Sequence, residues 1–119
     1  MIETFNILAA LLTIAFGAFG FLAPRFTMDV LDLKDIRSTM GLSEMRASVG
    51  GLFVGLGGLM LVFPAPMVLV TVGVAYAGAA LGRIVSLVLD APPRRKLLLY
   101  FAVESGLAAW LILANVPTG

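Results

Sequence analysis

The chain has 119 residues, of which 61% are hydrophobic and 13% are charged, and its formal net charge is +1. A soluble domain of this size could not cover so much apolar surface with so few polar side chains, so the composition predicts an integral membrane protein. The balanced charge excludes the basic stripe of a nucleic-acid-binding protein, and the absence of cysteine and histidine excludes disulfides and the usual ligands of zinc and haem, so we expect no nucleic-acid partner, no cofactor and no metal site.

Four apolar runs divide the chain, and we expect each to be a membrane-spanning helix. The predicted spans cover residues of about 5–22, 46–63, 67–89 and 97–116. Together they predict an all-α, integral membrane four-helix up-down bundle that forms a single domain over residues 1–119 and has the lipid bilayer as a partner.

In the first span, small and polar residues recur every three or four positions. They are Asn6, Ala10, Thr13, Gly17 and Gly20. This spacing places them on one stripe of a helix, which we expect to face other helices. The only early charge is Glu3, where a signal peptide would carry Lys or Arg, so we expect a retained helix.

The segment that follows is the most polar of the chain. Apolar residues recur at helical spacing among its charges, at Phe26, Val30, Leu33, Ile36 and Met40. This pattern predicts a short interfacial amphipathic helix between spans one and two. A solvated connection is the alternative.

The second span has the features of a helix that begins near Ser43. Ser43 resembles an N-cap, and Glu44 would lie in the first turn, where a carboxylate suits the helix dipole. One face of the span carries Ser48, Gly51, Gly55 and Gly58. Gly51 and Gly55 form a GxxxG pattern, which lets another backbone approach closely.

The third and fourth spans carry charged residues within apolar sequence. One face of the third span holds Tyr76, Arg83, Ser86 and Asp90. Gly78 and Gly82 form a second GxxxG pattern on an adjoining face. On the fourth span, Tyr100 and Glu104 share a polar stripe. The turn at Pro64-Ala65-Pro66 predicts an antiparallel return between spans two and three.

Arg83 needs an anionic partner, and Glu104 is the best candidate. Arg83 lies roughly 10 Å along its helix from Asp90, and Glu104 roughly 12 Å from Lys96, so the two charges lie at similar depth. A lone charge in mid-membrane costs on the order of 3 kcal/mol, so we expect the two to meet.

Further polar residues enter from the same side. We expect a ligand-binding or structural ion cluster of Glu44, Arg46, Arg83, Asp90 and Glu104, with Ser48, Tyr76, Ser86 and Tyr100 as polar neighbours. The cluster could lock the helices in register, bind a lipid headgroup, quinone or anion, or carry protons, ions or a small solute. We expect no catalytic residue, because no histidine is present as a base and both lysines lie in polar connections.

Basic residues predict the orientation. They flank the first connection at Arg25, Lys34, Arg37 and Arg46 and the third at Arg94, Arg95 and Lys96. By the positive-inside rule, we expect a multi-pass protein of the cell inner membrane with both termini periplasmic. The run of residues 94–96 is either this topology determinant or a docking site for a cytoplasmic partner.

Three short motifs carry a resemblance. They are Glu44-x-Arg46-Ala47 followed by Gly50-Gly51, Gly82-Arg83 with Ser86 and Asp90, and Glu104. They resemble an uncharacterised bacterial family of small four-helix inner-membrane proteins that is distantly similar to the DoxX-like group. The resemblance covers nearly the whole chain and implies a four-helix bundle in which the five cluster residues belong together. The four-helix glutathione-handling membrane enzymes differ, because their adjacent Glu and Arg are separated here by Met45.

These patterns favour a non-catalytic accessory or self-associating membrane subunit. Its glycine grooves, Gly51 with Gly55 and Gly78 with Gly82, would receive a helix of another subunit or of a second copy. Internal packing is the alternative role for the grooves. The alternative function is a small carrier or ligand-binding membrane protein that uses the Arg83 and Glu104 cluster.

Overall fold

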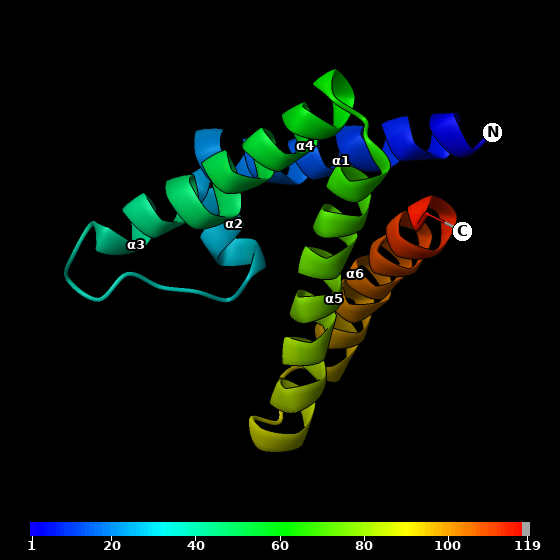
Figure 1. The fold of residues 1–119 in the computed structure, drawn as a ribbon. Helices are drawn as coiled ribbons and strands as arrows, with labels where there is room; N and C mark the ends of the chain where they lie inside the picture. The colour runs from blue at the N-terminus through cyan, green and yellow to red at the C-terminus, as the bar shows by residue number, and fades with distance from the viewer. Residues whose placement is uncertain (118–119) are drawn as a thin grey trace. The chain divides into compact units, whose positions relative to one another are not determined.

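The computed structural model describes residues 1–117, and within this range the chain is helical and has no β-strand (Figure 1). The helices are α1 (Ile2–Leu22), α2 (Pro24–Val30), α3 (Met40–Glu44), the π-helix η1 (Met45–Gly51), α4 (Leu52–Val62), α5 (Pro66–Leu89) and α6 (Arg94–Asn115). Because α3, η1 and α4 follow one another without a break, they form one long helix. The all-α class is therefore confirmed.

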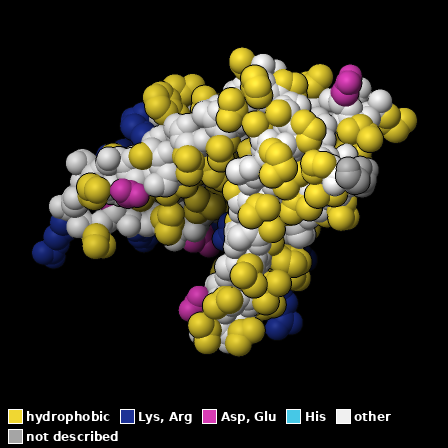
Figure 2. All heavy atoms as spheres, viewed as in Figure 1, with side chains coloured by type: hydrophobic (Ala, Val, Ile, Leu, Met, Phe, Trp, Pro, Cys, Tyr) yellow, Lys and Arg dark blue, Asp and Glu magenta, His cyan; other side chains and the backbone are white. Residues whose placement is uncertain are grey.

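Four of these helical stretches are long and apolar enough to cross a membrane. They are Ile2–Leu22, Met40–Val62, Pro66–Leu89 and Arg94–Asn115. Many of their large apolar side chains are exposed, and Figure 2 shows hydrophobic side chains over most of the visible surface. Water-soluble proteins rarely expose apolar patches of this extent, so the helices suggest a multi-pass membrane protein.

The chain forms two compact units. Unit 1 consists mainly of Glu3–Phe63 and holds α1 to α4, and unit 2 begins at Pro64 and holds α5 and α6. Each unit is a helical hairpin with its own packing. The predicted return between spans two and three, and the assembly of all four spans into one bundle, stay predictions.

In unit 1, the predicted stripe on α1 is confirmed. Its five members, Asn6, Ala10, Thr13, Gly17 and Gly20, are all buried. The Thr13 hydroxyl donates to the Ala9 carbonyl at 2.8 Å, so this buried polar group is satisfied within its own helix.

The backbones of α1 and the second span come into direct contact at glycines. A Cβ built on Gly17 would lie 2.6 Å from the Val54 nitrogen, and one on Gly50 would lie 2.5 Å from the Phe21 nitrogen. Because a backbone atom cannot move aside as a side chain can, only glycine fits at these two positions. The contact is the close approach that small residues permit between membrane helices.

This contact uses a different row of glycines from the one that the GxxxG pattern indicated. A Cβ on Gly57, seven residues after Gly50, would lie 2.9 Å from the Ala10 carbonyl oxygen, whereas one on Gly55 would meet nothing within 4 Å. At Gly51 the nearest atom would be 3.4 Å away, which is ordinary contact. Both rows have helical spacing, so periodicity alone does not distinguish them.

The second span begins earlier than predicted and contains a π-helix. It starts at Met40 with Thr39 at the N-cap, so Ser43 lies within the first turn and is not the N-cap. At the other end of η1, the Leu52 N–H bonds to the Ala47 carbonyl, five residues back. A π-turn therefore holds one residue more than an α-turn.

The predicted interfacial helix between spans one and two forms only in part. Its first turns are α2, but the chain leaves the helix at Asp32, which has a φ of 58°. The Leu33 N–H bonds to the Met28 carbonyl at 2.8 Å, the long hydrogen bond of a Schellman motif, which ends a helix. The apolar pattern through Met40 therefore does not correspond to one continuous helix.

Unit 2 is a hairpin of α5 and α6, which lie side by side (Figure 1). Its core is formed by Leu69, Val72, Tyr76 and Ala80 of α5 and by Leu97, Ala108 and Leu111 of α6. At Gly73 a Cβ would lie 2.9 Å from the Leu111 Cβ, so this glycine permits the close approach. Gly78 and Gly82 do not, because a Cβ at either position would meet nothing within 4 Å.

We predict that Gly50→Ala destabilises the protein by about 2 kcal/mol or more, because the added methyl group forces two backbones apart. Gly106→Ala is the control, since a Cβ there meets nothing within 4 Å and Gly106 lies on neither predicted groove, and it should leave stability unchanged or raise it by up to about 1 kcal/mol. Unfolding of the two variants in detergent micelles checks this, and equal effects would contradict the backbone contact.

Candidate functional site

The best-defined polar site lies in unit 2, where Arg83 of α5 meets Glu104 of α6. The Nε and Nη2 atoms of Arg83 donate to the Oε1 atom of Glu104 at 3.0 and 2.8 Å. Arg83 lies three residues after the buried Ala80, so it continues the core row of α5 towards α6. Helical spacing therefore aims the guanidinium at the neighbouring helix.

Tyr100 provides a second contact for the guanidinium. The Arg83 Cζ atom lies 5.3 Å from the centroid of the Tyr100 ring, a cation–π geometry. Tyr100 and Glu104 are four residues apart and share a face of α6. One face of α6 thus supplies both an aromatic ring and a carboxylate to a single cation.

Burial of the pair is unequal, and one oxygen has no partner. The Arg83 side chain is 36% exposed and the Glu104 side chain 13% exposed. Both hydrogen bonds go to Oε1, whereas Oε2 is buried and has no hydrogen-bond partner within the described part of the chain. A two-oxygen Arg–carboxylate fork would use both atoms, so this arrangement leaves an acceptor open.

The other predicted members from α5 lie outside this contact. Asp90 is exposed at the C-cap of α5, where its N–H bonds to the Ser86 carbonyl at 2.8 Å. Tyr76 is buried in the core between the helices, at 5% exposure. The hydroxyl of Ser105, the residue after Glu104, donates to its own helix at 2.7 Å.

Glu44 and Arg46 belong to unit 1 and have separate partners there. Glu44 Oε2 accepts a hydrogen bond from the Ser48 hydroxyl at 3.1 Å. Arg46 Nη1 donates to the Phe21 carbonyl at 2.6 Å, near the negative end of the α1 dipole. Their membership of one cluster with Arg83, Asp90 and Glu104 stays a prediction.

Three features of these sites were not indicated by the sequence pattern. They are the cation–π contact of Tyr100, the Phe21 carbonyl as the partner of Arg46, and the close backbone contact with α1 at Gly50 rather than at Gly51. The four-residue spacing of Tyr100 and Glu104 would have indicated the first. A main-chain acceptor such as the Phe21 carbonyl leaves no signal in residue types.

We predict that Arg83 and Glu104 are energetically coupled. Arg83→Met or Glu104→Leu alone should each cost on the order of 2–3 kcal/mol, because each leaves a charge unpaired among apolar helices. The double variant should cost less than the sum of the two single variants, because it leaves neither charge behind.

Unfolding of the single and double variants in detergent micelles measures this coupling. Ser105→Ala is the control, since its hydroxyl bonds only within α6, and it should change stability by less than about 1 kcal/mol. If the two single effects add to within about 0.5 kcal/mol, the pair is not coupled.

No curated protein and no solved structure is significantly similar to this chain. The similarity to the DoxX-like group therefore stays a prediction. A family model described as a domain of unknown function (DUF4345) matches residues 1–115, so this helical chain belongs to the DUF4345 family.

Proposed function

We propose that the protein is a non-catalytic, multi-pass subunit of the inner membrane that associates with other membrane helices, either of a second copy or of other subunits. The observation that carries this proposal is the set of glycines that their own hairpin does not use. Association with another helix would explain why glycine occurs at positions where nothing in the hairpin requires it.

Five described glycines are of this kind, and four of them lie in the two predicted grooves, Gly55 and Gly58 on α4 and Gly78 and Gly82 on α5, while the fifth is Gly106 on α6. A Cβ at any of them would meet no atom within 4 Å. By contrast, Gly17, Gly50 and Gly73 are each in close contact with a neighbouring helix. Glycine lowers helix stability by about 1 kcal/mol relative to alanine, so unused glycines are costly unless another helix packs on them.

The lack of a catalytic role is supported by the chemistry of the side chains. The chain has no histidine or cysteine, and the Ser105 hydroxyl donates to a main-chain carbonyl, which cannot act as a base. A serine nucleophile requires a general base to take its proton. A structural role requires neither a nucleophile nor a general base.

A ligand-binding or carrier protein is the second candidate. One observation favours it, the buried Oε2 atom of Glu104, which has no hydrogen-bond donor within residues 1–117. A ligand with a hydroxyl or ammonium group would satisfy it. Glu104→Gln separates this candidate from the first, because ligand binding would be lost from a protein that remains folded and associated.

We predict that Gly55→Leu and Gly82→Leu weaken association at least about tenfold, equal to about 1.4 kcal/mol. Gly106→Leu is the matched control, since Gly106 also has open space around it but lies on neither predicted groove. Native mass spectrometry after release from the native membrane in mild detergent measures the assembly. A wild-type protein that is a lone monomer would contradict the proposal, as would equal loss in the control.

We predict that both termini and the turn between α4 and α5 are periplasmic. Because the chain has no cysteine, a single cysteine introduced by substitution is the one thiol of the protein that a reagent can label. A membrane-impermeant thiol reagent applied to intact bacterial cells should label Ala65→Cys, whereas Ser38→Cys should react only after the membrane is opened. The reverse pattern would overturn the orientation.

A further inference from the structure

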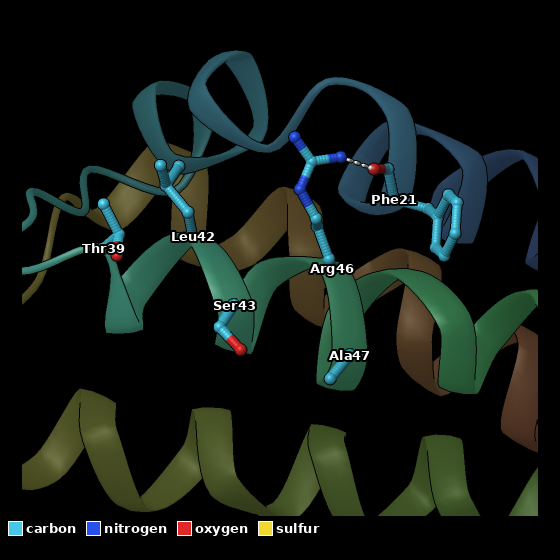
Figure 3. Close-up of a pocket in the computed structure, with 6 residues that line it drawn as sticks. All are labelled: Phe21, Thr39, Leu42, Ser43, Arg46 and Ala47. Carbon is cyan, nitrogen blue, oxygen red and sulfur yellow. Dashed lines mark hydrogen bonds between the residues drawn. The ribbon is translucent and has the colours of Figure 1, made fainter.

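An open hollow lies in unit 1 where α1 ends and the second span begins (Figure 3). It is a shallow depression, open to the outside, and is lined by Phe21, Thr39, Leu42, Ser43, Arg46 and Ala47. Its wall combines apolar side chains with two hydroxyl groups and one guanidinium, so it suits a ligand that is charged at one end and apolar at the other.

Arg46 is held in place but retains free donors. Its Nη1 atom donates to the Phe21 carbonyl at 2.6 Å, while its second terminal nitrogen points away from Phe21 (Figure 3). A guanidinium has five N–H donors in a rigid fork, so one bond fixes the group and leaves the others available. The side chain is exposed, so these donors are accessible.

The charge of Arg46 has no ionic partner within residues 1–117. The nearest carboxylate in the sequence, that of Glu44, accepts from Ser48, and the ion pair of this unit joins Arg25 to Asp35 at 3.9 Å. An arginine beside apolar helices therefore offers a cationic site for an anion from outside the chain.

We propose that this hollow binds the phosphate of an anionic phospholipid. Phosphate oxygens fit the planar fork of a guanidinium. Phe21 and Leu42 provide apolar surface for the start of the acyl chains. The position favours a lipid over a soluble anion, because the hollow lies at the end of a helix of membrane-spanning length, where headgroups would lie.

The test is lipid binding to the full chain in mild detergent, measured by native mass spectrometry during titration with phosphatidylglycerol. We expect one tightly retained phosphatidylglycerol per chain, bound at least about tenfold more tightly than phosphatidylcholine. Arg46→Gln should weaken phosphatidylglycerol binding about tenfold, since it removes charge-assisted hydrogen bonds. Arg25→Gln is the matched control, because it removes the same charge from the same unit, and it should change binding by less than about twofold.

Ala47→Glu tests the same site without removing the bond from Arg46 to Phe21, so the proposal remains testable if Arg46→Gln does not fold. The new carboxylate would repel phosphate and should abolish tight binding, whereas Ser38→Glu, outside the hollow, should not. Equal loss in Arg25→Gln and Arg46→Gln would overturn the proposal, because binding would then be diffuse attraction. Displacement of the lipid by millimolar inorganic phosphate would also overturn it, by assigning the site to a free anion.

Discussion

The pairing of a cation with an anion between two apolar helices is the constraint on which unit 2 depends. Arg83 has lost much of its hydration, and Glu104 and the Tyr100 ring replace it. Arg83 lies on α5, and both of its partners lie on α6. The contact therefore also fixes the position of α5 along the axis of α6. A slip of one helical turn would move the charges apart by about 5.4 Å.

Unit 1 is held by another means. Its helices approach so closely that peptide groups touch at Gly17 and Gly50, and Arg46 closes the end of α1 through the Phe21 carbonyl. Here the specificity comes from shape, since dispersion and main-chain contacts hold helices together where lipid is as apolar as the side chains. An ion pair therefore joins the two helices of unit 2, and close backbone packing joins those of unit 1.

The sequence predicts the all-α class and the four long apolar helices because apolar runs and helical spacing are strong signals. The stripe on α1 follows from the spacing of its small residues, and Glu104 is the carboxylate that matches Arg83 in depth. Other features depend on local backbone geometry. The αL conformation of Asp32 ends α2 although the apolar pattern continues. Two rows of glycines have helical spacing in the second span, and the packing of α1 decides that Gly50, and not Gly51, makes the close contact.

The π-helix in the second span places an extra residue between two sets of contacts with α1. Met45 and Gly50 are both buried, five residues apart, because the wide turn brings them to the same side. Each turn of this kind contains one residue more than an α-turn. The part that begins at Leu52 is anchored to α1 through Gly57, and η1 is anchored to α1 through Gly50 and through the bond from Arg46 to the Phe21 carbonyl, so the wide turn sets the rotation of one set of contacts relative to the other.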